Sequence, residues 1–144
     1  FSGYLANAQA TADAFTADGW FRTGDLARLD AQGNLSITGR SKEVINRGGV
    51  KFNPADVEAA IAGHPAIELC AIVPMPDPVL GERACCFVVA RGGAEIDLDA
   101  IRAWLARHGI AKTKWPERLE VIEEMPMTPT RKIKKAELAK RVAG

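Results

Sequence analysis

The chain has 144 residues, 47% of them hydrophobic and 26% charged, with a formal net charge of +1 at pH 7. These values suit a globular protein of about one domain and exclude bulk electrostatic attraction to nucleic acid. No apolar run approaches the roughly 20 residues that span a bilayer, and the first residues lack the pattern of a signal peptide. We therefore expect a cytoplasmic protein with no membrane span.

The first forty residues predict a short helix and a β-hairpin. Residues 8–15 favour the helix, which an Asp-Gly pair interrupts shortly afterwards. Strand-like segments at 26–29 and 34–38 are joined by Asp-Ala-Gln-Gly, a sequence typical of hairpin turns. Because this region has too few apolar positions for a core of its own, we expect residues 1–40 to be the end of another domain.

Residues 41–144 predict a small domain. It begins with a second hairpin that turns at Gly48 and Gly49, and an Asn-Pro pair then provides the cap and first residue of a helix over 53–63. Apolar runs and amphipathic spacing predict the remaining elements. We expect strands at 69–73, 84–90 and 119–122, and helices over 97–108 and 135–142.

The order of these elements defines the expected fold class. Alternating helices and strands favour α/β (α+β), with a three-stranded sheet flanked by helices and the β-hairpin beside it. The first two strands are separated by the sequence PMPDPVLGE, whose prolines, aspartate and glycine are typical of turns.

The three cysteines, Cys70, Cys85 and Cys86, lie within apolar runs and form neither a CxxC pair nor an even set. Adjacent cysteines on a strand point to opposite faces, so at most one of the last two can share a site with other residues. We expect reduced thiols that pack in the core, with a reactive thiol as the alternative, and no metal site.

The first candidate for chemistry is Asp25, which follows Thr-Gly in a tight turn. Its two carboxylate oxygens suit the paired hydroxyls of a ribose, and the alternative is an Asx turn that satisfies its own backbone. Arg40 follows the hairpin, whose two strands can return it to the side of Asp25. An acid and an always-charged guanidinium would then share one site, although a plain surface ion pair fits the same pattern.

The second candidate is Lys132, in the sequence PTRKIKK at 129–135. It lies in a loop between an acidic strand end and a basic helix, where it can move. A mobile lysine suits negative charge that appears only in a transition state, as in acyl adenylation, where one ammonium is worth about a hundredfold or more in rate. The alternative is a solvated basic run.

Three segments cover nearly the whole chain in a fixed order. They are DGWFRTGDLARLDAQGNLSITGRSKEVINRGGVKFNPADVE, PDPVLGE and MPMTPTRKIKK. Together they resemble the C-terminal end of the acyl- and aryl-CoA synthetases of the adenylate-forming superfamily. The resemblance implies that residues 1–40 end the large adenylation domain and that residues 41–144 form the mobile C-terminal domain. In that family the small domain rotates after the acyl-adenylate forms.

The resemblance also implies roles for individual residues. Asp25 matches the aspartate that binds the ATP ribose, and Arg40 matches the arginine that supports it. Lys42 matches the hinge between the two domains, and Lys132 matches the lysine of the adenylation step.

The glycine hairpin and the residue before Lys132 add detail to this resemblance. Gly48 and Gly49 hold the place of the hairpin that meets the pantetheine of CoA, where glycine lets a thin thiol arm pass close to the backbone. Relatives usually have glycine where this chain has Arg131, and we hypothesise that Arg131 supplies a second cation near phosphate. The hairpin sequence INRGG resembles members that act on aryl and alicyclic carboxylates.

The implied reaction is that of an ATP-dependent carboxylate–CoA ligase. A carboxylic acid, aromatic, alicyclic or medium-chain, is adenylated with release of pyrophosphate, and the acyl group then forms a thioester with CoA. The cofactors are ATP, CoA and Mg²⁺, whose ligands we expect outside this chain. The phosphate loop and acyl pocket belong upstream in the family, so we expect a fragment that is inactive without the large domain of the same chain.

Two alternatives remain open, and a third is disfavoured. The enzyme could be an aryl-acid AMP ligase that loads a carrier-protein pantetheine, or the fragment could be a noncatalytic binding module. Glutamates interrupt the lysines that a nucleic-acid module would need. Lysines in this loop of the family are acetylated, so a lysine acetyltransferase acting on Lys132 is a further expected partner, because acetylation removes the cation.

Overall fold

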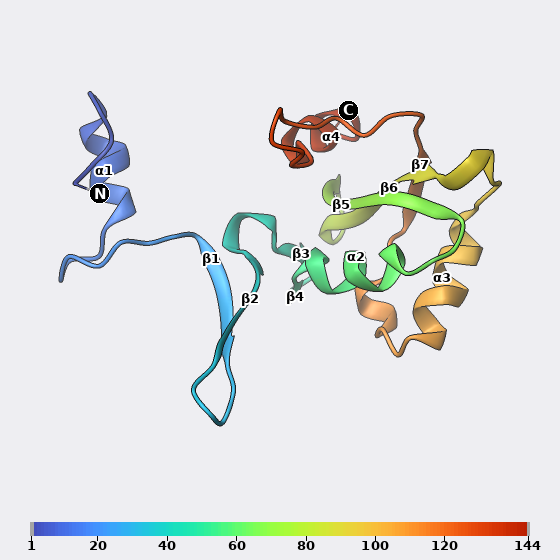
Figure 1. The fold of residues 1–144 in the computed structure, drawn as a ribbon, viewed down its shortest axis with the longest axis horizontal. Coiled ribbons are helices and arrows are strands. Elements are labelled where there is room, and N and C mark those ends of the chain that lie inside the picture. Colours follow the sequence, from blue (N-terminus) through green and yellow to red (C-terminus); the bar gives the residue numbers. More distant parts are fainter. Residues whose placement is uncertain (1, 144) are drawn as a thin grey trace. The chain divides into compact units, whose positions relative to one another are not determined.

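A computed structural model describes residues 2–143, and the chain forms two compact units, Phe1–Lys42 and Glu43–Gly144. The first unit contains one helix and one antiparallel hairpin (Figure 1). Its elements are α1 (Ala8–Ala14), β1 (Asp25–Leu29) and β2 (Leu35–Arg40). The Asp30 carboxylate accepts the backbone N–H groups of Gln32 and Asn34, which fixes the turn between the strands. The expected helix and hairpin are confirmed, with β2 ending two residues later than expected, at Arg40.

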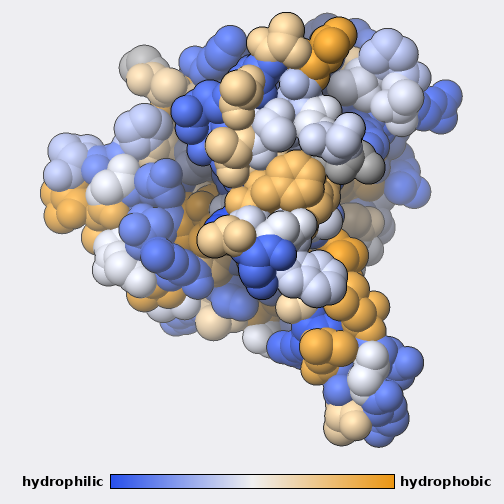
Figure 2. All heavy atoms as spheres, turned by 90° about the vertical axis from the view of Figure 1, so that its left-hand side faces the viewer, coloured by the Kyte–Doolittle hydropathy of each residue, from blue (hydrophilic) through white to orange (hydrophobic). Residues whose placement is uncertain are grey.

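The β1–β2 hairpin leaves apolar side chains on its surface. Leu29, Leu35 and Ile37 are each more than 60% exposed. Figure 2 shows orange apolar residues among blue hydrophilic ones on the protrusion at the bottom of the view. Single exposed apolar residues are common on protein surfaces, but three on one short hairpin form a cluster. The hairpin therefore does not bury its own apolar face.

The second unit contains five strands and three α-helices in the described residues. The strands are β3 (Ile45–Arg47), β4 (Val50–Phe52), β5 (Ile67–Asp77), β6 (Gly81–Ala90) and β7 (Arg118–Val121). The helices are α2 (Pro54–Ala62), α3 (Leu98–Arg107) and α4 (Lys135–Arg141), with short 3₁₀ turns at Arg91–Gly93 and Lys112–Lys114, and a further 3₁₀ turn at Ser41–Glu43 spans the boundary between the units. The expected cap is confirmed, because Asn53 accepts the Ala55 N–H and Pro54 is the first residue of α2.

The α/β class is confirmed, but the expected three-stranded sheet is wrong. All five strands form one sheet in the order β4-β3-β6-β5, and β7 pairs in parallel with β6. The hairpin joins this sheet through the single pair Arg47 and Gly81. One such pair leaves no periodic pattern in the sequence, which explains why the hairpin was expected to stand apart.

The segment PMPDPVLGE, expected to be a turn, is mostly strand. β5 continues to Asp77 and β6 begins at Gly81, so only residues 78–80 form the turn. β5 lies at the edge of the sheet, and its neighbour β6 pairs with it along its whole length. An edge strand tolerates Pro74 and Pro76 because the missing N–H groups need not remove ladder bonds.

The sheet separates two apolar clusters, and the helices cover both of its faces. α2 and α3 pack on one face and α4 on the other (Figure 1). Cys86 belongs to the cluster under α2 and α3, and its neighbour Cys85 belongs to the cluster under α4. The expected opposite orientation of these cysteines is therefore confirmed. Each face of the sheet carries an apolar cluster that helices cover.

All three cysteines are free thiols, as expected. Burial raises the pKa of Cys70 and of Cys85 to about 12, and it raises the pKa of Cys86 well above its ordinary value. At neutral pH the thiols are therefore protonated and unreactive, which supports a packing role.

None of the helices within residues 2–143 is long and apolar enough to cross a membrane. The same residues contain no group of three or more His, Cys, Asp or Glu side chains placed to hold a metal ion.

We predict that Cys85 and Cys86 in the native chain resist alkylation by iodoacetamide at about pH 8, because both side chains are covered and protonated. In urea all three cysteines should react. Mass spectrometry of digests measures labelling at each position. Equal labelling rates for Cys85 in the native and the unfolded chain would contradict this description of the core.

Candidate functional site

Asp25 and Arg40 form the first candidate group, in the unit Phe1–Lys42. Asp25 begins β1, Arg40 ends β2, and the antiparallel register places the two residues opposite each other. Arg40 Nε lies 2.9 Å from Asp25 Oδ1. The Asp25 backbone N–H donates to the Thr23 hydroxyl at 3.1 Å, so Thr23 fixes the backbone at the start of β1. The hairpin therefore brings the acid and the guanidinium together, as the sequence predicts.

The Asp25 carboxylate keeps surface available for a ligand. Its side chain is 27% exposed and that of Arg40 is 59% exposed. The guanidinium orients one carboxylate oxygen, which leaves the other free of that ion pair. An oriented, partly open carboxylate can accept hydrogen bonds from two neighbouring hydroxyl groups.

A cleft of about 530 Å³ lies beside this pair within the same unit. α1, the segment before β1 and the end of β2 line the cleft, and the lining includes Gly24, Arg40 and Lys42. Ser41 links the end of β2 to the segment before β1, because its N–H donates to the Gly24 carbonyl at 2.8 Å. The volume falls within the range of small-molecule sites. Lys42, the predicted hinge, is the last residue of this unit.

The glycine hairpin forms the second candidate group, in the unit Glu43–Gly144. Gly48 and Gly49 join β3 to β4 with φ values of +56° and +90°. A two-residue hairpin turn with positive φ at both positions favours glycine. A Cβ on Gly48 would lie 2.9 Å from Leu80 Cδ2, and the Gly48 N–H donates to the Leu80 carbonyl at 2.8 Å. The hairpin backbone thus lies directly against the β5–β6 turn.

Acidic side chains of neighbouring segments hold this hairpin in place. The Glu82 carboxylate accepts the Asn46 N–H at 2.7 Å. The Glu117 carboxylate binds the Arg47 guanidinium and also accepts the Ala84 N–H at 3.0 Å. The sequence analysis missed these contacts, because Glu82 and Glu117 are single acidic residues with no motif around them.

Lys132 directly follows a closed three-residue loop at 129–131 and pairs with Thr128 across it. The Arg131 N–H donates to the Thr128 carbonyl at 2.9 Å, and the Thr128 N–H donates to the Lys132 carbonyl at 2.8 Å. The Lys132 N–H in turn donates to the Thr128 hydroxyl at 3.0 Å. The Lys132 side chain is exposed, and within residues 2–143 no hydrogen bond or ion pair engages its ammonium. The ammonium is therefore available to a ligand.

Arg131 adopts a left-handed backbone conformation, with φ of +59°. A turn followed by a left-handed third residue is a common three-residue hairpin loop, and glycine is favoured at that third position. This geometry explains why glycine at this position suits the family. Arg131 keeps the same loop at a cost of about 1 kcal/mol.

The predicted residues therefore fall into two sets. Asp25, Arg40 and Lys42 lie in the first unit, whereas the glycine hairpin and Lys132 lie in the second.

Comparison with known proteins assigns this architecture to a family. Residues 56–132 match the AMP-binding enzyme C-terminal domain, which is more than half of the chain and ends at Lys132. The chain belongs to this family.

Relatives of known name extend the similarity across the whole chain. Salicylyl-CoA synthase / salicylate adenylyltransferase of Streptomyces sp. is 44% identical over 99% of this chain and 26% of its own length. The 2,3-dihydroxybenzoate-AMP ligase of Bacillus subtilis (strain 168) is 39% identical over 98% of this chain and 26% of its own length. The chain thus spans about a quarter of the relatives that it matches.

Among solved structures, ATP-bound MatB from Rhodopseudomonas palustris superposes with a TM-score of 0.89 and 30% identity. The match covers 98% of this chain and 28% of MatB. This chain therefore has the fold of the matching part of MatB, whose structure has been solved with ATP bound.

We predict that Arg131→Gly leaves the free energy of unfolding unchanged or raises it, because relief of the left-handed strain offsets the added freedom of glycine. Arg131→Val should lower it by about 1 kcal/mol or more, since β-branched residues are outliers at positive φ. Denaturant unfolding measures both variants. A glycine variant less stable than the valine variant would contradict the loop geometry.

The glycine variant also tests the hypothesis that Arg131 supplies a second cation near phosphate. If the hypothesis is correct, the affinity of the full-length enzyme for ATP falls in Arg131→Gly. Unchanged or higher affinity would count against it.

Proposed function

We propose that this chain is the C-terminal part of an AMP-forming carboxylate–CoA ligase. The observation that carries the proposal is Lys132, an exposed ammonium that has no partner among residues 2–143 and lies beside a closed loop at the end of the family match. A lysine that is displayed but unpaired suits a ligand that carries transient negative charge. The Asp25–Arg40 pair supplies the second requirement, an oriented acceptor for a nucleotide.

In the first half-reaction an oxygen of the substrate carboxylate attacks the α-phosphorus of ATP. The bond from that phosphorus to the bridging oxygen of pyrophosphate breaks, and pyrophosphate leaves with the bonding electrons. Asp25 accepts hydrogen bonds from the ribose hydroxyls, and Arg40 keeps the carboxylate oriented. Lys132 stabilises the negative charge that gathers on the α-phosphate and the attacking carboxylate. Mg²⁺ bound outside this chain would offset charge on the leaving pyrophosphate.

In the second half-reaction the thiol of CoA attacks the carbonyl carbon of the acyl-adenylate. The acyl–phosphate bond breaks, AMP leaves, and the proton of the thiol is lost to solvent or base. The hairpin at Gly48 and Gly49 offers bare backbone along which the pantetheine arm can pass. The carboxylates of Glu82 and Glu117 hold that backbone in position. A change of backbone angles near Lys42 moves Lys132 away from the reacting atoms and brings the hairpin at Gly48 and Gly49 to them.

The proposed substrate is an aromatic carboxylic acid, with alicyclic and medium-chain acids as the other members of the series to be tested. Two observations support the aromatic acid. The two relatives described above are named for salicylate and 2,3-dihydroxybenzoate, and the hairpin sequence INRGG resembles that of aryl-activating members.

A carrier-protein pantetheine is the second candidate acceptor. The reason to consider it is the 39% identity to a ligase that is named for AMP and not for CoA, because that name does not specify the acceptor. The thiol arm is chemically the same in both cases, so the hairpin serves either acceptor. A cytoplasmic location and acetylation of Lys132 by a lysine acetyltransferase remain predictions, and the exposure of Lys132 supports the latter.

We predict that Lys132→Ala in the full-length enzyme lowers carboxylate-dependent exchange of pyrophosphate into ATP by about a hundredfold or more. Thioester formation from preformed acyl-adenylate should persist, because the lysine acts in the first half-reaction. The series of aromatic, alicyclic and aliphatic acids identifies the substrate in the same assay.

Lys134→Ala is the matched control. Lys134 is a neighbouring exposed lysine that precedes α4, and its ammonium lies 3.9 Å from Glu137 on that helix. It should retain exchange activity. Undiminished exchange in Lys132→Ala would reject the assigned role and favour a noncatalytic binding module.

A further inference from the structure

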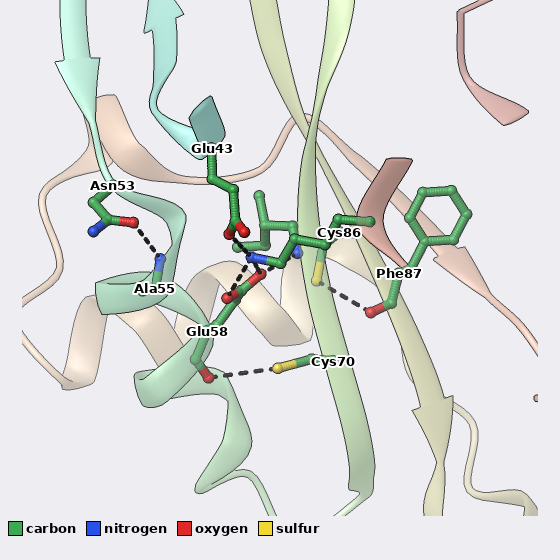
Figure 3. A network of polar contacts seen from close by, with 9 residues as sticks. Glu43, Asn53, Ala55, Glu58, Cys70, Cys86 and Phe87 are labelled. Carbon is green, nitrogen blue, oxygen red and sulfur yellow. Dashed lines mark hydrogen bonds and ion pairs between the residues drawn. The ribbon is translucent and has the colours of Figure 1, made fainter. Parts of the chain in front are cut away.

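Three residues beyond Lys132, α4 begins with a lysine whose ammonium is fully engaged. Lys135 Nζ lies 2.7 Å from Glu43 Oε2. It also lies 2.8 Å from Oε1 and 3.0 Å from Oε2 of Glu58. In Figure 3 dashed lines join the carboxylates of Glu43 and Glu58 to one unlabelled nitrogen, which the distances above identify as Lys135 Nζ. Two carboxylates on one ammonium form a contact unlike that of a solvated basic run.

The three side chains of this cluster are partly shielded from water, and Glu43 is the most exposed of them. The exposed fractions of Lys135, Glu43 and Glu58 are 21%, 36% and 18%. Burial by itself lowers the pKa of Lys135, but its hydrogen bonds to Glu43 and Glu58 outweigh burial and raise the pKa above its ordinary value. The ammonium is therefore charged across the physiological range, and its removal would leave two carboxylates close together without a cation.

Glu58 connects this cluster to the sheet. It lies on α2, and its Oε1 accepts the N–H of Ile72 on β5 at 2.6 Å. β5 is an edge strand, so a backbone N–H that faces away from β6 needs such a partner. The carboxylate that binds Lys135 is thus itself fixed by two elements.

Ile133 packs against the apolar cluster under α4, and Lys135 is the nearest residue to Lys132 along the chain whose side chain forms ion pairs with α2 and with Glu43. Lys132 is bound to Thr128 across the loop, and the Lys134 N–H donates to the Pro126 carbonyl at 2.8 Å. These bonds close the loop on itself but do not attach it to α2 or to the segment after the predicted hinge. Lys135 makes both attachments.

Glu43 gives this attachment its functional meaning. It is the first residue of the second unit and directly follows Lys42, the predicted hinge. The ion pair therefore joins the base of the Lys132 loop to the residue where the second unit begins.

We propose that Lys135 is a positioning residue for the adenylation step, which ties the Lys132 loop to Glu43 beside the hinge and to Glu58 on α2. This inference rests on the proposed function of Lys132. Because of the tie, a turn of the backbone at Lys42 carries Lys132 with the second unit as one body. Without it, Lys132 would reach the α-phosphate in a wider range of positions, and even small misplacement is costly in rate.

The test uses the full-length enzyme and compares Lys135→Met, which keeps the length but loses the charge, with Lys135→Arg, which keeps the charge. We expect Lys135→Met to lower kcat of carboxylate-dependent pyrophosphate exchange by about tenfold or more, with KM for ATP changed less than about threefold. Thioester formation from preformed acyl-adenylate should change less than about threefold. Lys135→Arg should recover most of the exchange rate.

Two further variants separate positioning from folding. Lys134→Met removes a neighbouring charge that does not belong to this cluster, so this variant should retain full exchange. Glu43→Gln leaves the Glu58 pair in place, so it should fold even if Lys135→Met does not, and it should lower kcat in the same direction. In a double-mutant cycle the pair Glu43→Gln and Lys135→Met should be no slower than the slower single variant.

The outcomes distinguish this inference from the proposed function. Loss of exchange in Lys132→Ala together with normal exchange in Lys135→Met, or in Glu43→Gln if Lys135→Met does not fold, would overturn the positioning role alone. An equal fall in both half-reactions that follows a fall in melting temperature would reduce Lys135 to a structural residue. Normal exchange in Lys132→Ala would reject the proposed function itself.

Discussion

The antiparallel pairing of β5 with β6 is the constraint on which the second unit depends. The ladder runs from Ile67 opposite Ala90 to Asp77 opposite Gly81, and its alternating side chains enter both apolar clusters. Its turn end carries the glycine hairpin, through the Leu80 carbonyl and the Glu82 carboxylate. Its outer edge carries Glu58 and, through it, Lys135. The glycine hairpin and the lysine that follows the Lys132 loop are therefore both held by one pair of strands.

Two lysines three residues apart illustrate how context decides the role of a charge. Lys135 is shielded and bound by two carboxylates, so its charge is already neutralised by the protein and serves to fix structure. Lys132 is exposed and has no partner in the described part of the chain, so its charge is available to a substrate. Of two lysines three residues apart, Lys135 thus holds the structure and Lys132 acts in the proposed chemistry.

Local features were predictable from the sequence because their causes are local. The Asn53–Pro54 helix start, the turn at Gly48 and Gly49 and the return of Arg40 to Asp25 each depend on residues close in sequence or on one hairpin. The resemblance supplied the family, which the comparison confirms. The roles assigned to these residues remain predictions.

The missed features depend on contacts between distant residues. Lys135 looks like one lysine of a basic run, since Glu43 and Glu58 lie 92 and 77 residues before it. All five strands were expected, but the joining of the hairpin to the sheet was missed because a single residue pair connects it to β6. The long β5 was missed because proline usually indicates a turn, and only the position at the sheet edge makes it acceptable in a strand.

The central claim is that one mobile unit serves two half-reactions by turning at Lys42. The most direct measurement fixes that residue by Lys42→Pro, which restricts its φ, and measures pyrophosphate exchange and thioester formation from preformed acyl-adenylate in the full-length enzyme. Lys42→Ala, which leaves the backbone free, is the control. The account predicts that Lys42→Pro keeps one half-reaction and loses the other, whereas Lys42→Ala keeps both. Equal retention or equal loss of both half-reactions in Lys42→Pro would contradict it.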